Sequence, residues 1–153
     1  MKFKNFLVST IILLSWEALA CPNNTTARNE IIAGKATCTL SGNHLNEILN
    51  LKAEFSYILE GDTRFGGDNN NSSILNIEPG TTLYGAPGAF LVIMRGSKIY
   101  ANGTAAAPVV FTALQRENLR PGLWGGVVLN GNARINNCKP GAPICEGSDE
   151  GIK

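Results

Sequence analysis

The chain has 153 residues, with 13 basic and 12 acidic side chains and a net charge of +1. A single domain is the default expectation for this length. The nearly balanced charge gives no electrostatic reason to expect nucleic acid or an anionic membrane surface as a partner. Glycine is abundant, with 17 residues, and both Gly and Asn tolerate the left-handed backbone of tight turns. This composition favours short strands joined by many turns.

The first segment has the pattern of an export signal. Lys2 and Lys4 precede an apolar run over residues 6–16, and small residues at Ala18 and Ala20 fit the positions that a signal peptidase inspects. We therefore expect residues 1–20 to be a signal peptide and the protein to be exported, to the periplasm, to the cell surface or outer membrane, or into the medium.

Cys21 has two possible fates. "ALAC" resembles a lipobox, whose cysteine is lipidated and becomes the first residue of the mature chain. A lipobox usually has Leu where this sequence has Ala18, so cleavage after Ala20 without lipidation fits better. Lipidation of Cys21 remains the alternative, and it is the only membrane attachment that we expect.

The mature chain would carry an even number of cysteines, which suits an oxidising compartment. Cys138 and Cys145 bracket the loop sequence "KPGAPI", so we expect a disulfide between them. Cys21 and Cys38 are then left as the second pair. A metal site is the weaker reading, because the chain has a single histidine and the cysteine spacing is not that of a zinc site. We expect no cofactor.

Residues 21–39 are expected to form an N-terminal linker or cap. The segment that follows leads into the main domain, and residues 43–51 could be a short cap helix because Leu45, Ile48 and Leu49 have helical spacing. Such a cap would cover the exposed edge of a sheet.

A repeated pattern dominates the centre of the chain. "ILNIEPGTTLYG" at residues 74–85 resembles "FLVIMRGSKIY" at residues 90–100, with Gly80 matching Gly96 and Tyr84 matching Tyr100. Pairs of apolar residues, whose members lie on one face of a strand, extend this pattern at nearly even intervals along the chain. The pairs are Tyr57 and Leu59, Leu75 and Ile77, Leu91 and Ile93, Val109 and Phe111, and Val127 and Leu129.

Short strands that recur at nearly regular intervals predict a solenoid. We expect an all-β fold, a right-handed parallel β-helix over residues 40–153 with about five short coils and an open C-terminal end. The apolar pairs would stack as two interior columns, about 4.8 Å per step. The first column would hold Leu75, Leu91, Val109 and Val127, and the second Ile77, Ile93, Phe111 and Leu129.

Two groups of polar residues are candidates for chemistry. Glu78 and Arg95 could line a carbohydrate groove, with Arg95 as a base, although solvated residues on a sheet face are the more ordinary reading. Asp62 and Asp68, with Asn69–Asn71, could ligate calcium, but no calcium-loop motif is present and a turn is favoured.

We expect mainly structural roles for the remaining candidate residues. His44 has no partner pattern of a catalytic triad, so we expect a capping or surface histidine. Tyr84 and Tyr100 are expected to stack at equivalent places, where they would pack the coil or contact sugar rings. Trp124 is expected to fasten a loop over the next turn.

Together, these segments resemble a family of exported bacterial proteins with a pectin-lyase-like right-handed parallel β-helix. The resemblance covers residues 40–147 and includes "LWGGVVLNGNARIN" at residues 123–136. Members are surface or secreted proteins, often lipoproteins, of unassigned activity, and they are typically longer. The resemblance implies that this chain is an N-terminal fragment, from a truncated gene or a frame disruption, or a piece that depends on a partner.

These features favour a non-enzymatic scaffold, adhesin or binding module, with carbohydrate or a surface protein as the candidate partner. The first alternative is a polysaccharide lyase or glycoside hydrolase, or a remnant of one. It would need acidic and basic residues clustered on one sheet face, which only Glu78 and Arg95 approach. The second alternative is a truncated product without function.

Overall fold

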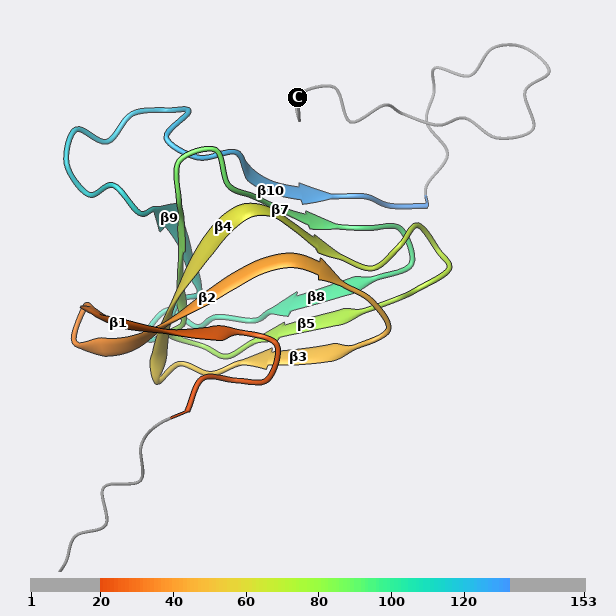
Figure 1. Ribbon diagram of the computed structural model, residues 1–153, viewed down its shortest axis with the longest axis horizontal. Helices are drawn as coiled ribbons and strands as arrows, with labels where there is room; N and C mark the ends of the chain where they lie inside the picture. The colour runs from red at the N-terminus through yellow and green to blue at the C-terminus, as the bar shows by residue number, and fades with distance from the viewer. Residues whose placement is uncertain (1–19, 133–153) are drawn as a thin grey trace, which may run out of the picture.

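The computed structural model describes residues 20–132, and all of its regular secondary structure is β. Ten strands follow one another along the chain (Figure 1). No helix that could cross a membrane occurs between residues 20 and 132. The strands are β1 (Thr26–Ile32), β2 (Lys35–His44), β3 (Ile48–Leu51), β4 (Phe55–Phe65), β5 (Ile74–Ile77), β6 (Thr82–Gly85), β7 (Phe90–Ile93), β8 (Lys98–Ala101), β9 (Val110–Ala113) and β10 (Gly126–Leu129).

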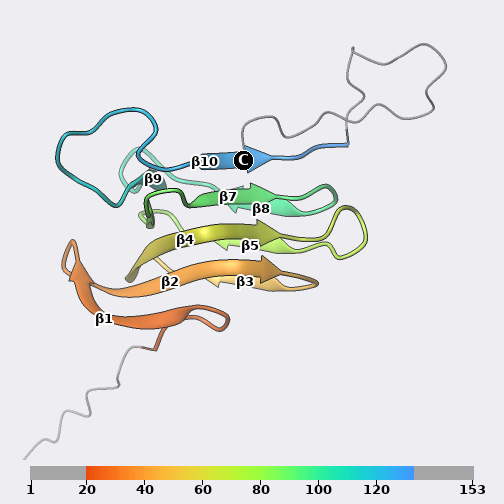
Figure 2. The same cartoon turned by 45° about the horizontal axis from the view of Figure 1, so that its top comes forward.

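The strands stack in three rows, and Figure 2 shows the successive levels one above another. The first row is β2, β4, β6 and β9, and the second row is the C-terminal half of β4 with β7 and β10. The third row is the separate three-stranded sheet of β3, β5 and β8. Every pairing within these rows is parallel. The chain therefore returns repeatedly to the same rows, one level higher each time.

Glycine makes the corners that the repeat predicted. Gly80 (φ 84°) and Gly96 (φ 82°) both have a left-handed backbone. In each turn an amide bonds the carbonyl three residues earlier, Thr81 to Glu78 at 3.2 Å and Ser97 to Met94 at 3.0 Å. The repeated pattern is thus one strand–turn–strand unit used at two corners of the fold, with Gly at the position where a type II turn requires positive φ.

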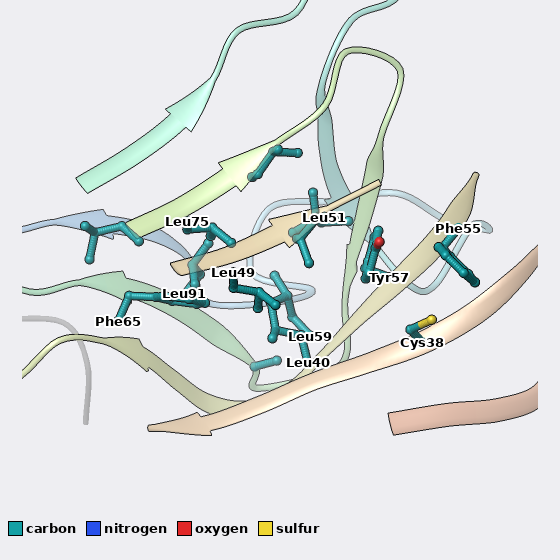
Figure 3. Close-up of a cluster of buried hydrophobic side chains, with 14 residues drawn as sticks. Cys38, Leu40, Leu49, Leu51, Phe55, Tyr57, Leu59, Phe65, Leu75 and Leu91 are labelled. Carbon is teal, nitrogen blue, oxygen red and sulfur yellow. The ribbon is translucent and has the colours of Figure 1, made fainter. Parts of the chain in front are cut away.

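The core lies between the rows and is built from columns of inward-facing side chains (Figure 3). In the third row Leu75 lies between Leu49 and Ile99. In the first row Leu83 lies between Tyr57 and Phe111. Each fully buried Leu stabilises the fold by about 1.5–3 kcal/mol through removal of apolar surface from water.

The expected pair of columns is wrong in its arrangement. Leu75 and Ile77 belong to the third row, whereas Leu91 and Ile93 belong to the second row and pair with Val127 and Leu129. Phe111 belongs to the first row, and Val109 precedes β9. The nearly even interval between the apolar pairs is mostly the number of residues from a strand in one row to the next strand in another row. Successive levels of one row lie further apart in the chain, as the pairing of Leu75 with Leu49 shows.

The predicted cap helix over residues 43–51 is also wrong. Residues 48–51 form β3, in which Leu49 and Leu51 are buried. Leu45 and Ile48, which supported the helical spacing, are exposed. Alternation of buried and exposed residues in β3 replaces the helical period.

The lower edge of the stack is covered by β1, which pairs antiparallel with β2 and contains a bulge between Arg28 and Ile31 (Figure 2). Arg28 forms ion pairs with Glu30 and Glu60 there. The expected boundary between cap and main domain, at residue 40, falls inside β2. At the upper edge, β10 exposes 38% of Val127 and 64% of Leu129.

Candidate functional site

A groove of about 460 Å³ runs along the beginnings of the three strands of the third row. Its walls come from three successive levels, residues 46–48 before and in β3, residues 72–74 before and in β5, and Gly96 with Lys98 at β8. The groove therefore continues onto the outward surface of the third row.

Two columns of outward side chains form that surface, which we call the outer strip. It consists of Ile48, Ile74 and Lys98 in one column and Asn50, Asn76 and Tyr100 in the other. The alternation of a strand places these residues on the face opposite the buried Leu49 and Leu75 and the partly buried Ile99.

The outer strip mixes aromatic, amide, aliphatic and cationic groups. Tyr100 is 44% exposed, and the Asn76 amide donates to Asn50 Oδ1 at 2.7 Å. Among the described residues, no carboxylate forms an ion pair with the exposed Lys98. The strip thus presents donors, acceptors, one ring and one ammonium group to solvent.

His44 lies behind the groove wall and is only 5% exposed, so the expectation of a surface position is wrong. Its ring stacks on Phe65 with 4.4 Å between centroids, and Nδ1 contacts Glu47 Oε1. Ser73 Oγ donates to the His44 carbonyl at 2.8 Å and accepts from the Glu47 amide at 3.2 Å. The serine is bonded to the histidine backbone and not to its ring, so this is no Ser–His nucleophile pair.

Glu78 and Arg95 have separate partners. Glu78 Oε2 accepts from the Ala53 amide at 2.9 Å. Arg95 pairs with Asp68, with 2.6 Å between Nη2 and Oδ2. The hydrogen bond from Arg95 lowers the pKa of the Asp68 carboxyl below its ordinary value. Neither residue lines the groove.

The acidic and amide-rich loop is a turn in the structure. Asp68 and Asn69 have a left-handed backbone, with φ of 44° and 69°, which confirms the turn expected there. For Asp62 the turn expectation is wrong, because this residue lies in β4, where it pairs with Arg64 at 2.7 Å. Within residues 20–132, no three His, Cys, Asp or Glu side chains are grouped so as to hold a metal ion.

The two repeat tyrosines do not stack. Tyr84 is in β6 of the first row, where it is buried and has the Arg116 guanidinium 5.3 Å from its ring centre. Tyr100 is in β8 of the third row and contributes to the outer strip. Trp124 packs on the core beside Gly85, where an added Cβ would come within 2.3 Å of the indole.

A disulfide joins Cys21 and Cys38. The other expected pair, Cys138 and Cys145, lies outside the described residues. So does the expected signal peptide, apart from its last residue.

A family model described as a pectate-lyase-like β-helix domain matches residues 42–150. The chain belongs to this family, as the parallel rows of short strands also indicate. Comparison with curated proteins and with solved structures found no match.

Proposed function

We propose that the protein is an exported, non-enzymatic right-handed β-helix of the bacterial cell surface or periplasm that binds carbohydrate polymers through the outer strip. The predicted export signal supports the location, and the cysteine pair supports an oxidising compartment. The strand rows would wind as a solenoid, with the rigid stack serving as a scaffold for the binding face.

The outer strip is the observation that carries this proposal. Sugar rings pack their C–H faces on aromatic side chains, and their hydroxyl groups bond amides and charged groups. Tyr100, Asn76 and Lys98 supply these three kinds of contact side by side. Strand spacing sets the side chains about 4.8 Å apart, so a chain-like ligand can contact several levels at once.

The size of the strip favours a sugar over a protein partner. Two columns of three side chains make a much smaller patch than the roughly 800 Å² that each partner contributes to a stable protein interface. A groove of about 460 Å³ beside it is within the usual range for small ligands.

Binding of the mature protein to a panel of neutral and acidic polysaccharides tests the proposal. We expect retention on at least one polymer, and about a tenfold loss of affinity in Tyr100→Ala, because an aromatic contact contributes about 1 kcal/mol or more. Leu119→Ala, at a loop residue that is 67% exposed, is the control for loss of a large exposed side chain. Asn29→Ala in β1 is the control for Asn76→Ala.

Two results would contradict the proposal. One is retention that Tyr100→Ala and Asn76→Ala leave unchanged. The other is release of unsaturated or newly reducing sugar ends during the incubation, which would favour the lyase or hydrolase alternative. Mass analysis of the mature N-terminus tests export directly, with a Cys21 that carries no lipid as the expected first residue.

A further inference from the structure

The first described residues, 20–25, form a segment that we call the N-terminal strap. The disulfide from Cys21 to Cys38 fastens it to β2, and Cys21 packs on the core. Thr25 closes the strap on itself, since its amide and its hydroxyl both donate to the Pro22 carbonyl, at 3.1 and 2.7 Å. The strap is therefore a short, internally bonded loop with one covalent anchor.

A single side chain connects the strap to the groove. The Asn24 amide donates to Glu47 Oε2, and Glu47 lines the groove. The other carboxylate oxygen of Glu47 contacts the His44 ring, and its backbone amide bonds Ser73. Both carboxylate oxygens of this wall residue are thus engaged, one of them by the strap.

We infer that the Cys21–Cys38 disulfide positions Glu47 in the groove wall, and so regulates binding at the outer strip, through Asn24. This inference rests on the proposed function for its consequence, though not for its structural part. With the disulfide formed, the strap lies against the fold and Asn24 holds the Glu47 carboxylate. With the disulfide absent, the strap gains conformational freedom. The contact between Asn24 and Glu47 then becomes less favourable, because forming it costs the conformational entropy of the strap.

The redox step is a simple exchange. An added dithiol donates two electrons, the Cys21–Cys38 bond breaks to give two thiols, and the dithiol becomes a cyclic disulfide. Glu47 Oε2 then loses its donor in a groove wall that also includes Lys98. Attraction between the two charges would then compete with the ligand. Lipidation of the Cys21 sulfur would leave the groove in this second state, because a thioether sulfur cannot form the disulfide.

Three variants separate the steps. Cys21→Ser/Cys38→Ser removes the anchor. Asn24→Gly keeps the disulfide and removes only the amide contact, without backbone strain, because Asn24 has a φ of 62° that Gly adopts freely. Asn23→Ala, at the exposed neighbouring residue, is the matched control.

His44 gives a structural readout that does not depend on any ligand. It is the only histidine of the chain, so its ring proton signals in NMR spectra report the contact with Glu47. We expect both the double cysteine variant and Asn24→Gly to shift these signals and to weaken polysaccharide binding about three- to tenfold, the effect of one ordinary hydrogen bond. Asn23→Ala should change neither.

Unchanged His44 signals in the double cysteine variant would overturn the inference, whatever the binding shows. A shift in Asn24→Gly without one in the folded double cysteine variant would also overturn it, because the disulfide would then not control the contact. If all expected shifts occur but the parent protein binds no polysaccharide, the positioning of Glu47 is supported and the proposed function is refuted. Circular dichroism establishes that each variant is folded.

Discussion

The clearest test of the three-row core is the substitution Leu75→Ala. Leu75 is fully buried and lies between Leu49 and Ile99 in neighbouring strands, so side chains cover it on both sides. Stacked strands cannot move together to fill the space. Both the lost burial of apolar surface and the remaining cavity should therefore lower the free energy of unfolding. We expect a loss of about 3–5 kcal/mol in the free energy of unfolding. This is a large part of the roughly 5–15 kcal/mol that is typical of a domain.

Leu129→Ala is the matched control, because the same side chain sits at the upper edge with 64% of its surface exposed. Its cost should be below about 1 kcal/mol. Urea unfolding of the mature protein followed by circular dichroism measures both values. Equal costs for the two substitutions would refute the assignment of Leu75 to a column covered from both sides.

Three further outcomes follow from the structure. Gly85→Ala should destabilise the fold and change the fluorescence of Trp124, because the new Cβ would clash with the indole ring at 2.3 Å; an unchanged spectrum and midpoint would contradict that packing. Arg95 lowers the pKa of Asp68, so the pair should stabilise the protein above the ordinary Asp pKa and lose this effect as the pH falls through the lower folded value. Asp68→Asn should remove that part of the acid dependence of unfolding. Burial raises the pKa of Tyr57 to about 12 from 10.0, so its contribution to stability should be complete below pH 10.0 and be lost as the pH rises toward 12. Tyr57→Phe should abolish the step near pH 12 in an ultraviolet titration.

The parallel strands and their glycine corners could be predicted from the sequence. The repeat of residues 74–85 and 90–100, however, matches strands that lie in different rows of the fold. The two matched segments share a strand–turn–strand unit, yet their second strands, β6 and β8, belong to different sheets. The sequence also contained a repeat whose two copies lie on successive levels of the same row. "ILNL" at residues 48–51 and "ILNI" at residues 74–77 are nearly identical and become directly paired strands. Four-residue segments of this kind fit a helix as well as a strand, which explains the wrong helix over residues 43–51.

The candidate site was harder to predict, because its residues are the outward members of strands whose inward members gave the signal. Tyr100 matches Tyr84 in the repeat, but its actual neighbour is Asn76, one level earlier in the chain. Such a neighbour follows from the pairing of levels and not from local periodicity. The contact between Asn24 and Glu47 joins a loop to a corner, and neither residue belongs to the repeat. No spacing rule would have brought these two side chains together.

The antiparallel strand β1 makes the two edges of the stack different. Its bulge and its charged residues make the lower edge a poor template for another strand, whereas β10, which pairs with β7 below it, exposes the apolar side chains of Val127 and Leu129. Because β1 and β2 are also the first strands in the chain, folding from the N-terminus would form this protected edge before the strands that stack on it.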